Sequence, residues 1–173
     1  SFNGNIGSWN VSSVTNMHGM FQTATAFNQG VGDWNVSSVT DMSNMFSSTA
    51  FNQDIGSWNV GNVTNMFGMF TGAGSFNQDI SSWDVSNVTN MRSMFQISIA
   101  FNQDISGWDV SNVTDMSEMF EGNSSLSTTF NQNLASWDIG NVTTMTSMFS
   151  QNTGFSDANY KATIIGWAAQ STQ

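Results

Sequence analysis

The hydrophobic residues of this chain recur in one pattern about 25 residues long. All twelve methionines lie in six M-x-x-M-F units, and a Phe-Asn pair opens each repeat. Five tryptophans share this period at spacings of 24 or 25 residues: Trp9, Trp34, Trp58, Trp83 and Trp108. Trp137 and Trp167 follow at longer spacings. Repetition at this period is typical of chains whose units stack on one another, so we expect six coils over residues 1–154.

The spacing inside one repeat, FNQDISSWDVSNVTNMRSMF at residues 76–95, predicts its local structure. Trp83 and Val85 alternate with polar residues, which predicts a short strand with both side chains pointing inward. From Val85 onward every third residue is apolar, and a period of three favours 3₁₀ turns over an α-helix. We therefore predict a leucine-rich-repeat-like, right-handed solenoid with one short parallel strand per coil, followed by 3₁₀ or helical turns.

The two ends of the chain depart from the repeat. Residues 155–173 are expected to form a C-terminal capping helix, with Ser156 as N-cap and Tyr160, Ile164, Trp167 and Ala168 on one face. At the other end the first coil has no M-x-x-M-F unit before it. This uncapped face would expose an edge strand, so we expect that further coils or a domain precede it, or that it meets a partner.

The pattern F-N-Q-D-I-x-x-W-D-V-S-N-V-T-x-M-x-x-M-F resembles the 25- to 26-residue repeat of bacterial surface proteins and lipoproteins, a group similar to the BspA-like leucine-rich repeats. Ile80, Trp83 and Val85 stand where a leucine-rich repeat has L-x-x-L-x-L. The resemblance implies a secreted or surface-displayed solenoid with a role in adhesion, and it implies no catalytic residues.

Charge narrows the range of partners. The formal net charge is -10, and the only lysine and arginine are Lys161 and Arg92. Such a chain cannot neutralise the phosphates of a nucleic acid or the headgroups of an anionic membrane. It has no cysteine and no apolar run long enough to span a bilayer, so neither a thiolate site nor a membrane span is expected.

Aspartates recur at two positions of the repeat. Stacking would bring equivalent carboxylates within about 5 Å of one another, where Ca²⁺ could bridge them. Earlier coils have Asn or Gly at these positions, which favours turn residues over a calcium site. The two columns are Asp54, Asp79 and Asp104, and Asp84, Asp109 and Asp138.

Other recurring polar residues have a structural interpretation. The Asn after each opening Phe predicts an amide ladder, and the single recurring Thr indicates turn hydroxyls rather than an ice-binding array. The chain also has seven N-x-S/T sequons, whose shifting place in the repeat suggests a by-product of its composition, with glycosylation as the alternative hypothesis. They begin at Asn10, Asn35, Asn62, Asn87, Asn112, Asn123 and Asn141.

Catalytic chemistry has little support in this sequence. There is one histidine, and no Ser-His-Asp arrangement recurs, so we predict that the chain is not an enzyme. One return segment, EGNSSLSTT at residues 121–129, is four residues longer than usual. A tolerated insertion is the simpler interpretation. Loops that interrupt a repeat often contact partners, however, and under that alternative Glu118, Glu121 and Asn123 are the candidate contacts.

Taken with the absence of a catalytic pattern, the resemblance to bacterial surface repeats implies an extracellular or cell-surface protein that mediates adhesion or binds a protein or glycan. The alternative is a structural stalk or filament subunit, joined end to end through the uncapped N-terminal face.

Overall fold

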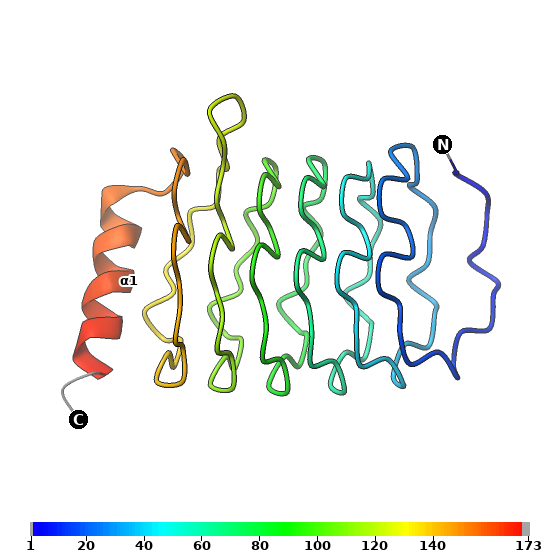
Figure 1. Ribbon diagram of the computed structural model, residues 1–173, viewed down its shortest axis with the longest axis horizontal. Coiled ribbons are helices and arrows are strands. Elements are labelled where there is room, and N and C mark those ends of the chain that lie inside the picture. Colours follow the sequence, from blue (N-terminus) through cyan, green and yellow to red (C-terminus); the bar gives the residue numbers. More distant parts are fainter. Residues whose placement is uncertain (1, 171–173) are drawn as a thin grey trace.

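The computed structural model describes residues 2–170, in which the chain winds through successive coils placed side by side (Figure 1). The helix α1, Asp157–Gln170, covers the C-terminal end of the stack. No helix in this described range is long and apolar enough to cross a membrane.

The predicted leucine-rich-repeat-like solenoid with one strand per coil is wrong. Throughout residues 2–170 parallel pairing is limited to isolated bridges, and the segment around Trp83 and Val85 is not a strand. All but one of the bridges, Thr128↔Asn152, lie in the part of the coil for which the period of three predicts 3₁₀ turns. Most of them join the residue before one M-x-x-M-F unit to its counterpart in the next coil: Asn16↔Asp41, Asp41↔Asn65, Asn65↔Asn90, Asn90↔Asp115 and Asp115↔Thr144.

We call the residues from the first Met of each unit to the third residue after its Phe the M-x-x-M-F arc. Its backbone conformation explains why this arc is not a strand. In the fourth coil Ser93 and Ile97 have φ values of 55° and 58°, in the left-handed region, which interrupts an extended chain. Hydrogen bonds therefore alternate along the arc. Ser93 N donates to Ser117 O of the next coil over 2.9 Å, whereas Met94 N donates to Met91 O of its own coil over 3.2 Å.

Aromatic rings fill the space between the two sides of each coil. Phe95 of the arc stacks on Phe101, which opens the next repeat, with ring centroids 3.9 Å apart, and it lies 5.6 Å from Phe70 of the preceding coil. The tryptophans from Trp34 to Trp137 are buried as well. Each donates its indole N–H to a carbonyl of the preceding coil, as Trp83 does to Ile55 O over 3.1 Å. Tryptophan thus supplies both apolar area and a bond between coils.

Helix α1 takes the place of a further coil. Ser156 caps its first turn, because its hydroxyl accepts the Asn159 N–H over 3.3 Å. The buried side of the helix passes through Thr163 and Trp167, whereas Tyr160 and Ile164, expected on that side, are 48% and 40% exposed. Residues 171–173 of the expected 155–173 cap lie outside the described part of the chain.

The first coil has a different surface. Phe2 is 50% exposed and Trp9 is 54% exposed, whereas their counterparts in the second coil, Phe27 and Trp34, are buried. Phe2 still stacks on Phe27, with ring centroids 6.0 Å apart, so its ring extends the aromatic row and is partly exposed at this end of the described stack.

Candidate functional site

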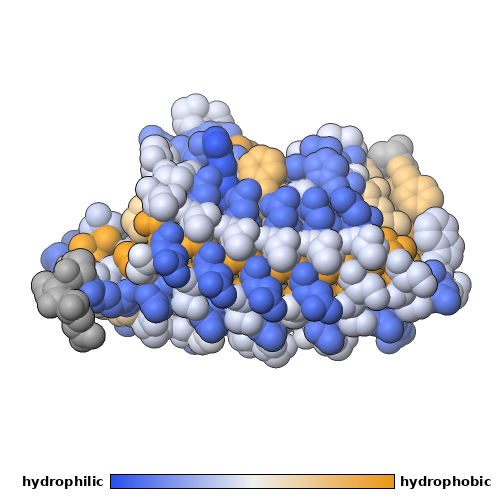
Figure 2. All heavy atoms as spheres, turned by 60° about the horizontal axis from the view of Figure 1, so that its bottom comes forward, coloured by the Kyte–Doolittle hydropathy of each residue, from blue (hydrophilic) through white to orange (hydrophobic). Residues whose placement is uncertain are grey.

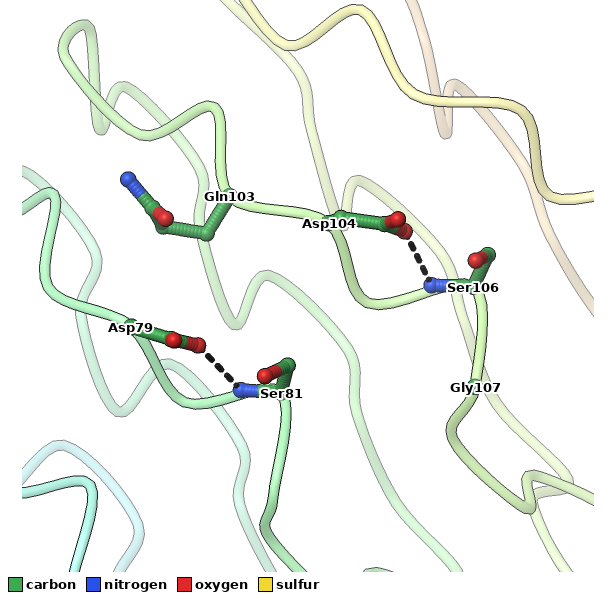
Figure 3. Close-up of a pocket in the computed structure, with 6 residues that line it drawn as sticks. All are labelled: Asp79, Ser81, Gln103, Asp104, Ser106 and Gly107. Carbon is green, nitrogen blue, oxygen red and sulfur yellow. Dashed lines mark hydrogen bonds between the residues drawn. The ribbon is translucent and has the colours of Figure 1, made fainter.

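The first Asp column lies in a series of tight turns. Asp79 Oδ1 accepts the Ser81 N–H over 2.9 Å, and Asp104 Oδ1 accepts the Ser106 N–H over 3.0 Å. A shallow hollow of about 370 Å³ lies between these two turns (Figure 3). Figure 3 shows that each carboxylate points to the serine of its own coil and not to the neighbouring carboxylate.

The second Asp column makes the same turn. Asp84 Oδ1 accepts both the N–H and the hydroxyl of Ser86, over 3.1 and 2.6 Å. Asn59, at the equivalent position of the third coil, accepts the Gly61 N–H over 3.1 Å. Since an amide oxygen makes the bond as well as a carboxylate does, the turn needs an acceptor and not a charge.

These bonds change the acidity of the carboxylates. The hydroxyl and the backbone N–H of Ser81 hold the pKa of Asp79 below its usual value, and those of Ser86 do the same for the pKa of Asp84. Ser106 and Ser111 likewise lower the pKa values of Asp104 and Asp109. The negative form of each group is therefore the one that the fold stabilises.

A cation would need ligands from several coils at once. In the part of the chain that the structure describes, no group of three or more His, Cys, Asp or Glu residues is placed to hold a metal ion. The other two members of the columns are also used by their own turns: Asp54 accepts Gly56 N over 2.9 Å and Asp138 accepts Gly140 N over 2.9 Å. Calcium binding by the columns stays an untested alternative, and the turn bonds account for the geometry without it.

Two of the three candidate contact residues near the long return segment come together. Glu118 forms an ion pair with Arg92, with Nη2 and Oε1 2.9 Å apart, and accepts the Ser93 hydroxyl over 2.9 Å. Glu121 accepts Gln96 Nε2 over 2.7 Å, and the same nitrogen lies 3.5 Å from Glu118 Oε2. Both carboxylates thus lie over the arcs of the fourth and fifth coils.

The third candidate, Asn123, has a different role. Its Oδ1 accepts the N–H groups of Ser125 and Leu126, both over 2.8 Å, and its own N–H donates to Leu126 O over 2.8 Å. Asn123 therefore closes the tip of segment 121–129 and does not join the glutamates.

Apart from Asn123, described above, the sequons lie in two structural settings. Asn10 and Asn35 accept turn bonds through Oδ1, from the N–H groups of Ser12 and Ser37. Four others donate Nδ2, the atom that would carry a sugar, to a carbonyl of the preceding coil over 2.7 or 2.8 Å: Asn62, Asn87, Asn112 and Asn141. Modification of these four would cost a bond between coils, and their glycosylation stays the untested alternative hypothesis.

The structure also assembles a group that sequence reasoning missed. His18 Nδ1 lies 2.6 Å from Ser43 Oγ, and Ser43 Oγ donates to Asp41 Oδ1 over 2.6 Å. A hydrolytic triad needs the histidine between serine and acid, whereas here the buried serine is in the middle and its proton is committed to Asp41. His18 and Ser43 occupy the same position of successive repeats, so superposing the repeats would have revealed the pair.

Comparison with known proteins gives one family and no individual relative. No curated protein and no solved structure shows a significant match to the chain. One family, described as "Mycoplasma protein of unknown function, DUF285", matches residues 1–96 and again residues 75–170. Because the two matches together span nearly the whole sequence, the chain belongs to the DUF285 family.

Proposed function

We propose that this chain is a non-enzymatic binding protein, which contacts a protein or a glycan outside the cell or at its surface. One observation carries the proposal: the coils place equivalent polar groups in continuous rows along the stack (Figure 2). Thr64 Oγ1, for example, donates to Thr40 O over 3.3 Å, and Thr89 Oγ1 donates to Thr64 O over 3.2 Å.

A second row shows how firmly these groups are held. Asn52 Oδ1 accepts the Asn77 N–H over 3.0 Å and Gln78 Nε2 over 2.9 Å, and the same arrangement links each coil to the next. At the last coil Ser156 N and Asn159 Nδ2 supply the two donors to Asn131 Oδ1. Ordered surface groups lose little conformational entropy on binding, which favours recognition by a long, shallow surface.

The chemistry of the chain supports a binding role over a catalytic one. The His18–Ser43–Asp41 group has the wrong order for nucleophilic attack, and the acidic turns use their oxygens locally. A net charge of -10 disfavours nucleic acid and anionic lipid as partners. Placement at the cell surface is supported by the resemblance of the repeat to those of bacterial surface proteins.

The experiment is a binding screen of the purified chain against a glycan array and a protein array. We expect saturable binding to a restricted set of ligands, and substitutions in one polar row should weaken it while the far-ultraviolet circular dichroism stays unchanged. Absence of saturable binding on both arrays would overturn the proposal.

A second candidate function is that of a structural subunit, joined to a second copy through the first coil. The exposure of Phe2 and Trp9 favours it, since a partner would bury both rings. Because α1 covers the other end of the stack, such a joint would pair two first coils and stop at a dimer unless α1 is displaced. Light scattering over a concentration series distinguishes fibres and dimers from a monomer, and a monomer at every concentration would exclude this candidate.

A further inference from the structure

Repetition breaks down at one position of the coil, where the side chain is exposed in some coils, as at His18 and Arg92, and buried in others, as at Ser43. The recurring Thr is identical in all six coils, whereas the residue after the first Met of the arc is His18, Ser43, Phe67, Arg92, Ser117 or Thr146. Both positions belong to the same stacked framework. The stack therefore accepts a different side chain at this position in each coil. As a result, the surface formed by the M-x-x-M-F arcs changes in chemistry from one coil to the next.

The long return segment 121–129 lies on the same coil as Glu118 and protrudes beyond the neighbouring coils (Figure 1). It is ordered by its own bonds, because Asn123 fixes the N–H groups of Ser125 and Leu126. Leu126 is 44% exposed at this tip. The exposed part of this apolar side chain adds no buried area to the fold and is accessible to a partner.

Bonds to both neighbouring coils hold the segment in place. On one side Ser127 Oγ donates to Gln151 O over 2.7 Å, and on the other Thr129 Oγ1 donates to Ile99 O over 2.8 Å. Thr128 is buried and donates its hydroxyl to Phe120 O over 2.7 Å. The insertion is thus a rigid projection, which reduces the entropy that binding would cost.

Two carboxylates lie at the base of this projection. Glu121 starts the segment, and Gln96 donates to both Glu121 and Glu118. The only cation bound there is Arg92, which pairs with Glu118, so the Glu121 carboxylate has no cationic partner in the described chain. A partner that brings a positive charge to this point would pair with Glu121 while it buries Leu126.

We propose that Leu126, Glu121 and Glu118 form a docking surface for a protein that receives Leu126 in an apolar pocket and presents basic side chains to the glutamates. This inference rests on the binding function proposed above and specifies its partner class. The overall charge of -10 would steer a basic partner toward the molecule. A second copy of the chain does not fit this chemistry, since it offers only Arg92 and Lys161 as strong cations.

The test uses a displayed library of random peptides selected against the folded chain. We expect the selected peptides to combine basic and apolar residues. Their affinity should fall by roughly tenfold or more for Leu126→Ser and for Glu121→Gln, and should decrease with added salt. Glu121→Gln keeps an oxygen that can accept the Gln96 bond, so its fold should be intact, which circular dichroism and thermal melting would verify.

Matched control variants lie elsewhere on the surface. Ile165→Ser removes another exposed apolar side chain, 69% exposed on α1, and Asp109→Asn removes another negative charge from a turn that tolerates Asn. Both should leave peptide affinity unchanged. If Leu126→Ser still binds the peptides with unchanged affinity, the docking surface is overturned. The same holds if the control variants lose as much affinity as the test variants. Either result leaves the proposed binding function intact. If no peptide is selected and the glycan and protein arrays are also blank, both proposals fail.

Discussion

Trp167 of α1 donates its indole N–H to Leu134 O over 2.8 Å, and this is the bond that each buried tryptophan of the stack makes to the coil before it. The helix also receives a donor from the last coil, because Thr163 Oγ1 accepts the Leu134 N–H over 3.0 Å. Gln170 adds a bond to Trp137 O over 2.7 Å. A helix has no free backbone donors along its length, so α1 pairs with the edge of the last coil through its side chains.

We expect Trp167→Ala to destabilise the whole stack by about 3–5 kcal/mol, because Trp167 is buried and its removal leaves a cavity and an unpaired carbonyl. Urea unfolding followed by circular dichroism would measure the loss. The matched control is Trp9→Ala in the first coil, where the side chain is 54% exposed and the expected change is only about 1 kcal/mol or less. Equal losses at the two positions would contradict the capping role of α1.

Thr23→Gly should stabilise the protein by about 0.5–1 kcal/mol. Thr23 is exposed and has a φ of 60°, a conformation that is costly for a β-branched residue and that Gly adopts readily. At the equivalent position of the third coil the chain has Gly72, with a φ of 67°. Thermal melting would show the gain. The control, Thr25→Gly, lies two residues on in an exposed position outside the left-handed region, and it should lower the melting temperature.

Part of this architecture could be predicted from residue spacing. The period of the Phe, Trp and Met residues corresponds to the coils that stack in the structure, and the Asx residues form the expected turns. The predicted strand was wrong because the alternation of Trp83 and Val85 with polar residues comes from tight turns and not from an extended segment. Tight turns on either side, closed by Trp83 N to Ile80 O and Val88 N to Val85 O, direct both side chains inward without an extended segment.

Other features depend on how the coils are aligned against one another. Ser93 and Ile97 are not typical left-handed residues, and their φ values follow from bonds that their N–H groups make to the next coil. The approach of His18 to Ser43, and of Arg92 to Glu118, likewise requires the alignment of residues about 25 positions apart. The hydrophobic period alone indicates which residues are buried, but not which polar side chains meet across coils.

Addition of Ca²⁺ is expected to leave the melting temperature unchanged. Asp79 and Asp104 each use Oδ1 for a turn of their own coil, and each carboxylate points to the serine of that turn (Figure 3). Melting curves with Ca²⁺ and with a chelator would be compared for the wild type and for Asp79→Asn. A rise in melting temperature with Ca²⁺ that Asp79→Asn abolishes would establish the calcium ladder in place of the turn interpretation.

Acid should weaken the fold through the turn carboxylates. Folding lowers the pKa of Asp84 below its usual value of 3.8, chiefly through the Ser86 hydroxyl, and the pKa of Asp109 is lowered in the same way by Ser111. The contribution of each carboxylate is therefore fully present above about pH 4 and is lost as the pH falls through the lowered folded-state pKa.

The variant that tests this is the double substitution Asp84→Asn and Asp109→Asn. Asn keeps the acceptor oxygen, as Asn59 shows at the equivalent position, so stability at pH 7 should change little. On acidification from pH 5 to pH 2 the urea midpoint of the variant should fall less than that of the wild type. The converse variant, Asn59→Asp, should make the urea midpoint more sensitive to acid. If the urea midpoint falls equally with pH in the wild type, the double variant and Asn59→Asp, these turns do not couple stability to pH.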